Sequence, residues 1–143
     1  MSENTIQVKI RFPTGEYEHA SFDLHDEAIS DPNNVQLDIS FLSRRETAIA
    51  PDYFEALTML RKKFEPEGLL IVCNGSVENV YPSAMARSMG GGLKAYRLTM
   101  GTPAKTADLV SIFDATLNSP PASVEQQEAF YQTWLLSLGK SQS

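Results

Sequence analysis

Cysteine and histidine are scarce in this chain, which has one cysteine, Cys73, and two histidines, His19 and His25. A single cysteine excludes an internal disulfide and a Cys-rich zinc site, and it fits a reducing cytoplasm. His25 lies close in sequence to Asp23 and Asp26, but this spacing matches no established ligand pattern and is typical of polar residues in a turn. We therefore predict no metal site and no cofactor.

Long apolar runs are also missing. No stretch approaches the roughly 20 apolar residues that cross a bilayer, and the N-terminal MSENTIQVKIRF has no apolar run after basic residues, so no signal peptide is expected. A chain of 143 residues with 42% hydrophobic and 21% charged side chains has the composition of a globular protein. We expect a single cytoplasmic domain over 1–143, without membrane contact.

Basic residues are few in the first third of the chain. Residues 1–40 hold eight acidic side chains against two basic ones, so this segment carries the whole net charge of −6. An acidic excess argues against nucleic-acid binding, which depends on neutralising phosphates. It suits either association with a basic protein or solubility alone. The first interpretation makes the acidic residues near one predicted loop candidates for partner binding: Asp23, Asp26, Glu27 and Asp31.

Hydrophobic patterning predicts the fold class. Alternating apolar residues indicate an antiparallel meander of three strands over 5–12, 17–24 and 35–42. An apolar spacing of three and four residues predicts an amphipathic helix within 50–68, and the continuous run 69–73 predicts a strand buried on both faces.

The second half of the chain adds shorter elements and one long helix. These are two helical turns over 82–89, a strand after the glycines, a short apolar element over 108–113 whose type the pattern leaves open, an edge strand being one option, and a helix over 123–140. Ser123 and Gln126 have capping-box spacing at the start of that helix. The sum is an α+β domain with a mostly antiparallel sheet and two main amphipathic helices packed on one face.

No residue pattern indicates catalysis. Cys73 ends an apolar run, where a thiol is usually buried and inert, and the sequence gives no group to orient a Cys–His pair. Ser76 follows a strand but lacks the G-x-S-x-G elbow of serine hydrolases. We expect no enzyme and assign no catalytic residue.

One alternative is an anion- or nucleotide-binding domain, or a small enzyme, that uses the loop and helix of 74–87. Ser83 precedes the short helix, whose N-terminus exposes N–H groups, and Arg87 would be a supporting cation. However, the glycines of 90–92 follow this helix, which is the reverse of a P-loop. They are more simply a helix stop and a close chain crossing.

The same region also has the side chains of an interaction surface. Tyr81, Met85, Met89 and Tyr96 offer aromatic and adaptable apolar contacts beside Arg87. Helical spacing is equally compatible with core packing, so both interpretations stay open. Tyr81 and Arg87 complete the candidate partner-binding residues.

The segment 73–115 resembles a group of small bacterial immunity proteins encoded beside polymorphic antibacterial toxins, which contact-dependent or type VI and Rhs systems deliver. The features that carry the resemblance are NVYPSAMARSMGGG, KAY and DLVSIF before an aspartate. It implies a cytoplasmic antidote that binds a cognate toxin domain and masks its active or substrate-docking surface. It supplies no catalytic residues. A third possibility is a structural or chaperone-like protein, for which we would expect a stable homo-oligomer.

Overall fold

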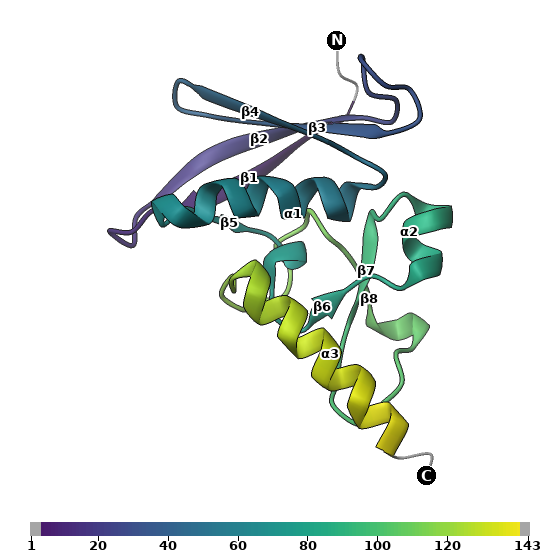
Figure 1. The fold of residues 1–143 in the computed structure, drawn as a ribbon. Helices are drawn as coiled ribbons and strands as arrows, with labels where there is room; N and C mark the ends of the chain where they lie inside the picture. The colour runs from purple at the N-terminus through teal and green to yellow at the C-terminus, as the bar shows by residue number, and fades with distance from the viewer. Residues whose placement is uncertain (1–3, 141–143) are drawn as a thin grey trace.

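The larger of two sheets forms one outer layer of the protein in a computed structural model that describes residues 4–140 (Figure 1). This sheet is antiparallel, with the strand order β4-β3-β2-β1-β5. Its strands are β1 (Thr5–Arg11), β2 (Tyr17–His25), β3 (Val35–Phe41), β4 (Arg44–Ala50) and β5 (Leu70–Val72).

Helix α1 (Tyr53–Phe64) lies against one face of this sheet, and the remaining elements lie on the far side of α1 (Figure 1). They include a second sheet of order β6-β7-β8, so the prediction of one sheet is replaced by two, while the α+β class is confirmed. The elements of this half are β6 (Val80–Tyr81), α2 (Ala84–Gly90), β7 (Lys94–Arg97), β8 (Leu109–Ser111) and α3 (Val124–Lys140), with the 3-10 turns η2 (Asn74–Ser76) and η3 (Thr106–Asp108). A further 3-10 turn, η1 (Glu65–Glu67), follows α1 beside the large sheet, where Glu67 pairs with Arg44 of β4.

The core lies between the large sheet and α1 and continues into the second half. Strand alternation turns Ile10, Phe22 and Ile39 toward the helix, and each is fully buried. Burial of one such side chain stabilises the fold by about 1.5–3 kcal/mol. Phe113, which follows β8, packs on Phe22 with ring centroids 4.9 Å apart. One apolar cluster thus joins both sheets.

Strand β4 was not predicted from the sequence. On the face that turns toward α1, its first half carries Arg44 and Glu46, and only Ala48 and Ala50 are apolar. The charged pair is accommodated because β4 is an edge strand: Arg44 Nε donates to Glu46 Oε2 over 2.9 Å, and its guanidinium lies over the Phe64 ring. The two small alanines allow α1 to pack close. Because β4 lies at the edge of the sheet, it can carry charged residues at positions that are apolar in the other strands. Its sequence therefore lacks the alternation of apolar and polar residues that predicts those strands.

The prediction for 69–73 is wrong in one respect. The run does form β5, but β5 pairs antiparallel with β1 at the edge of the sheet. Ile71 is buried toward the core, whereas Leu70 and Val72 are only half-buried. The strand is therefore not covered equally on both faces. By contrast, the expectation of an edge strand in 108–113 is confirmed, because β8 ends the small sheet.

Helix α3 docks mainly on α1 and β6, and the contact nearest its N-terminus is polar. Gln127 is 2% exposed, and its amide donates to the carbonyls of Gly75, Val77 and Val80. Its Oε1 accepts a 2.6 Å hydrogen bond from Arg61 Nη1.

The start of α3 has the predicted cap, and the side chains further along the helix differ in burial. The Ser123–Gln126 capping box is present, and Trp134 is buried. Leu135, one residue further on, is 39% exposed.

Arg61 fixes the two halves of the molecule to each other. Its buried guanidinium also donates to the carbonyls of Gly75, over 3.2 Å, and Ala122, over 2.9 Å. The described residues supply no carboxylate ion pair to it, so the cation is solvated by neutral oxygens of η2, the chain before α3 and α3 itself. Burial lowers the pKa of Arg61 from its usual value, but an arginine remains charged in proteins.

We expect Arg61→Met to lower the free energy of unfolding by about 2–4 kcal/mol, because the Ala122 carbonyl and the Gln127 side-chain oxygen would lose a buried donor. Urea denaturation measures this change. The control is Lys62→Met, which removes a neighbouring exposed cation and should stay within about 0.5 kcal/mol of wild type. Equal stability of the two variants would contradict the role given to Arg61.

Candidate partner-binding surface

The acidic residues singled out from the sequence do not all lie in one loop. Asp26, Glu27 and Asp31 lie in the connection between β2 and β3, as predicted. Asp23 instead lies within β2, on the face of the large sheet that points away from α1. The strand runs one residue past its predicted end, to His25, which pairs with Gln36 of β3.

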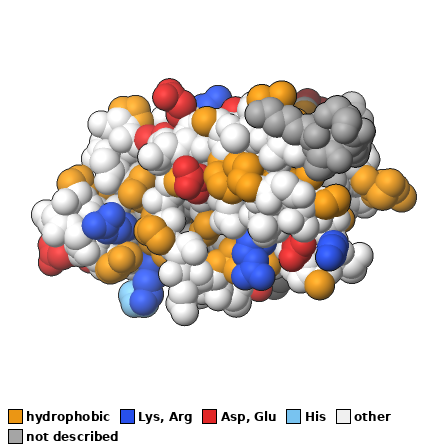
Figure 2. Space-filling model, turned by 90° about the horizontal axis from the view of Figure 1, so that it is seen from below, with side chains coloured by type: hydrophobic (Ala, Val, Ile, Leu, Met, Phe, Trp, Pro, Cys, Tyr) orange, Lys and Arg blue, Asp and Glu red, His pale blue; other side chains and the backbone are white. Residues whose placement is uncertain are grey.

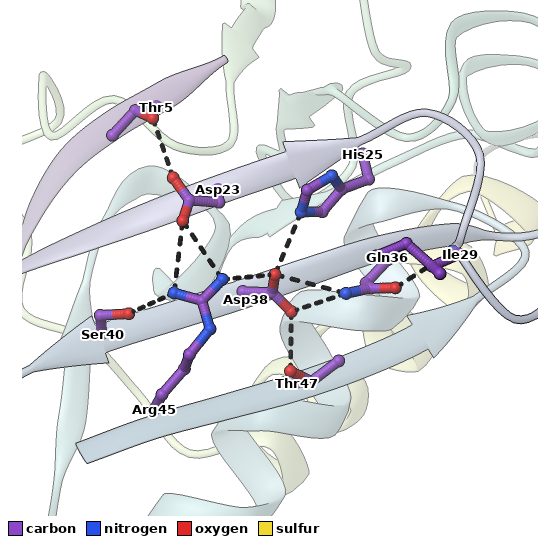
Figure 3. A network of polar contacts seen from close by, with 9 residues as sticks. All are labelled: Thr5, Asp23, His25, Ile29, Gln36, Asp38, Ser40, Arg45 and Thr47. Carbon is purple, nitrogen blue, oxygen red and sulfur yellow. Dashed lines mark hydrogen bonds and ion pairs between the residues drawn. The ribbon is translucent and has the colours of Figure 1, made fainter. Parts of the chain in front are cut away.

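Asp23 belongs to a polar network on that outer face (Figure 3). It accepts a hydrogen bond from Thr5 Oγ1 over 2.8 Å and faces the Arg45 guanidinium at 3.4 Å. The centre of the network is Asp38, which faces Asp23 across the β2–β3 pair and is only 2% exposed. The sequence did not indicate Asp38 as a buried residue. An acidic side chain at a polar position of an alternating strand is expected to face solvent.

Four side chains satisfy the Asp38 carboxylate (Figure 3). Thr47 Oγ1 donates over 2.7 Å, Gln36 Nε2 over 3.0 Å, Arg45 Nη2 over 2.8 Å, and His25 Nε2 lies at 3.1 Å. Burial raises the pKa of Asp38, but the hydrogen bonds and the positive charge of Arg45 outweigh this effect and lower it overall. His25 therefore contacts Asp38 rather than forming an ion site with Asp23 and Asp26.

The loop itself is tied down by two of its acidic residues. Asp26 Oδ1 accepts a 2.8 Å hydrogen bond from the hydroxyl of Tyr53 at the start of α1, and Asp31 accepts one from Asn34 Nδ2 over 2.6 Å. Burial, and then the Asp26 contact, raise the pKa of the Tyr53 hydroxyl. Glu27 is exposed, and Ile29 is 84% exposed. Glu27 and Ile29 are thus among the side chains that this loop exposes.

Tyr81 is engaged inside the fold. Its ring stacks on Tyr131 with centroids 3.9 Å apart, and its hydroxyl donates to Glu128 Oε2 over 2.7 Å. Partial burial, followed by the contact with Glu128, raises the pKa of Tyr81 to about 12. The residue therefore links β6 to α3 and keeps little free surface for a partner.

Arg87 is also engaged, and it holds α2 against α1. Its guanidinium lies 3.4 Å from Asp52 Oδ2 and over the rings of Phe54 and Tyr81. Asp52 is the N-cap of α1, where its other oxygen accepts from the Glu55 N–H. Arg87 is therefore an anchor at the back of α2.

The glycines of 90–92 complete this anchor, as the sequence predicted. Gly91 has φ +67° and ends α2, and its carbonyl accepts from the Tyr53 N–H over 2.8 Å. Gly92 has φ +71°, and a Cβ there would lie 2.7 Å from Asp52 Oδ1 and 2.9 Å from the Phe54 nitrogen. The segment is a helix stop that crosses the start of α1 at a distance only glycine allows.

The 74–76 loop is packed inside the protein. Asn74 and Ser76 are each 1% exposed, and the N–H groups of Asn74, Gly75 and Ser76 donate to carbonyls of the chain. None of these three N–H groups is free for an anion. Cys73 is buried beside Ser76, as expected, and burial raises the pKa of its thiol.

The opposite side of α2 is exposed and apolar. Met85 and Met89 are four residues apart, 68% and 81% exposed, and they line a groove of about 510 Å³ with Tyr96 of β7 and Leu109 of β8. The structure thus decides the open question for these methionines in favour of surface exposure. Figure 2 shows hydrophobic side chains projecting from the right-hand end of the molecule, the end at which Figure 1 places α2.

A second hollow joins this groove to the acidic loop. It has a volume of about 450 Å³ and is lined by Asp26, Leu24 and Phe113, among others. Leu93 and Lys94 line both hollows. The loop between β2 and β3 and helix α2 also lie on the same side of the ribbon (Figure 1). We call this region, from Glu27 through Lys94 to Met85, the α2 surface.

Comparison with known proteins adds no assignment to this geometry: no protein-family model matches the chain, and no curated protein matches it. Among the described residues, no three His, Cys, Asp or Glu side chains are grouped to hold a metal ion. A search of the same part of the chain finds no helix with the length and apolarity that a membrane span needs.

We expect Asp38→Asn to lower the free energy of unfolding by about 2–3 kcal/mol at pH 7, because an amide would turn a donor toward the donors around it. The pKa of Asp38 is lower in the folded protein, so the carboxylate stabilises the fold above its ordinary pKa of 3.8 and loses this effect as the pH falls further. Urea denaturation from pH 7 to pH 2 should therefore show the difference from wild type shrinking below pH 4. The exposed Asp114→Asn is the control; a difference that persists unchanged at pH 2 would contradict the assignment.

We expect Arg87→Met to lower the free energy of unfolding by about 1–2 kcal/mol, through loss of the ion pair with Asp52 and the two cation–π contacts. Arg97→Met removes an exposed cation nearby and should change stability by less than about 0.5 kcal/mol. Thermal unfolding of both variants checks this. Equal thermal stability of the two variants would contradict the assignment of Arg87 as a residue that holds α2 against α1.

Proposed function

We propose that this protein is an immunity protein that binds a cognate antibacterial toxin domain and masks its active or substrate-docking surface. The activity is binding rather than catalysis, and it takes place in the cytoplasm of the cell that carries the toxin. The sequence resemblance of 73–115 suggests the class. The observation that carries the proposal is the exposed methionine face of a helix whose other side is fixed to the fold.

An exposed apolar surface on a fixed support has the properties of a protein interface. Met85 and Met89 have flexible, polarisable side chains that adapt to the shape of a partner. Arg87 and the glycines of 90–92 hold the backbone beneath them, so binding needs little ordering of α2. Unpartnered large apolar side chains gathered on one surface are typical of interaction sites.

The acidic loop supports the same interpretation from the other end of the α2 surface. Two hydrogen-bonded aspartates fix its backbone, and Glu27 remains exposed. A carboxylate in this place would attract a basic surface, such as that of a toxin that binds RNA or nucleotide, and would speed the encounter. No observation favours an anion site at 74–76, whose N–H groups are used internally.

The test is binding to the toxin domain encoded in the neighbouring reading frame, measured by isothermal titration calorimetry. We expect the Met85→Glu, Met89→Glu double variant to bind at least about 100-fold more weakly, because two apolar contacts at the centre of an interface commonly contribute more than 1 kcal/mol each. Loss of protection of a cell that expresses the toxin should accompany the loss of binding.

The control is Leu136→Glu, which places the same charge on an apolar residue of α3 that is 68% exposed and lines neither hollow of the α2 surface. It should bind as wild type does. Equal binding by the double variant and the control would reject the α2 surface, and absence of any binding by the wild-type protein would reject the proposed function.

A further inference from the structure

On the α2 surface, a lysine lies between the apolar groove and the acidic loop. Lys94 lies where the two hollows meet, is exposed, and has no ion-pair partner among the residues that the structure describes. On the Met side of Lys94 the groove is apolar, and on the other side Asp26 lines the second hollow, with the exposed Glu27 next to it in the chain. A cation without an ion pair, placed between an apolar groove and an acidic loop, favours one orientation of a partner over the reverse.

The position of Lys94 is set by the fold rather than by its own contacts. It begins β7, whose next residue, Ala95, is fully buried, and its backbone pairs with Ser111 of β8. Leu93, immediately before it, accepts a backbone hydrogen bond from Ile112 over 3.0 Å. Pairing with β8 and the residue that follows it therefore holds the base of the Lys94 side chain at the junction of the hollows.

We infer that the occupant of the α2 surface is a segment of a partner protein that carries an apolar side chain and, next to it, a carboxylate. The apolar side chain fills the groove between Met85 and Tyr96, and the carboxylate pairs with Lys94. A basic residue further along the same partner faces Glu27. This inference rests on the proposed function, because it specifies the chemistry of the toxin surface that would bind there.

Charge complementarity is the basis for choosing this occupant. An acidic loop alone would suit any basic protein, but a uniformly basic partner would place a like charge against Lys94, and like charges opposed across an interface are unfavourable. A purely apolar partner would bury the Lys94 ammonium without a counter-charge, which is also costly. An apolar side chain flanked by a carboxylate avoids both penalties.

The experiment measures the affinity of the toxin domain from the neighbouring reading frame for Lys94→Glu and Lys94→Met. We expect Lys94→Glu to bind at least 30-fold more weakly and Lys94→Met to lose less, because the latter removes the charge without placing a like charge opposite the partner's carboxylate. The control is Lys9→Glu, which makes the same change of net charge at an exposed site of β1 that lines neither hollow.

The outcomes separate the inference from the proposed function. Affinity of Lys94→Glu within twofold of Lys9→Glu would overturn the inference, while weak binding by the Met85→Glu, Met89→Glu variant would still uphold the function. The wild-type protein could instead self-associate through these methionines, which would give a mass in solution that rises with concentration and does not rise for the double variant. Such a result would show that a second copy of the chain occupies the groove. That result, or no binding of the toxin, would overturn both.

Discussion

The arrangement of the two halves of this protein depends on a buried cation. Arg61 places a guanidinium between α1 and the chain that follows β5, where it must be solvated by the protein itself. The oxygens that do so come from Gly75 and, about fifty residues later in the chain, from Ala122 and Gln127. Because a guanidinium holds its donors in one plane at fixed angles, it aligns these two segments as well as attracting them.

The consequences extend to the α2 surface. With α1 held between the sheets, its N-cap Asp52 and the ring of Phe54 form a fixed base for Arg87. Arg87 orients α2, and the orientation of α2 exposes the methionines. The position of the exposed apolar groove thus depends on polar contacts in the interior of the protein. A second polar centre, Asp38, stabilises the outer face of the sheet from which the acidic loop extends.

The sequence predicted those parts of the fold that repeat a simple period. The strands β1, β2 and β3, the helix α1 and the capping box of α3 were identified because apolar spacing or cap chemistry is local. The helix stop at 90–92 was recognised for the same reason, since the need for glycine at a helix end is set by the backbone conformation of a few neighbouring residues. Strand β4 was missed because the positions that face α1 carry Arg44 and Glu46, which only an edge strand tolerates.

The candidate site was less predictable from the sequence. Tyr81 and Arg87 were singled out together with the methionines, but the sequence could not tell which members of this group pack inward. The tertiary structure decided that Arg87 faces Asp52 while Met89 faces outward, because that choice depends on where α1 lies. Lys94 stands in the KAY motif, but the sequence did not mark it as a candidate binding residue, since an exposed lysine at a strand end is ordinary. By itself the sequence determined local periods, caps and the acidic first third; pairing of distant segments alone decided which side chains are buried, satisfied or left for a partner.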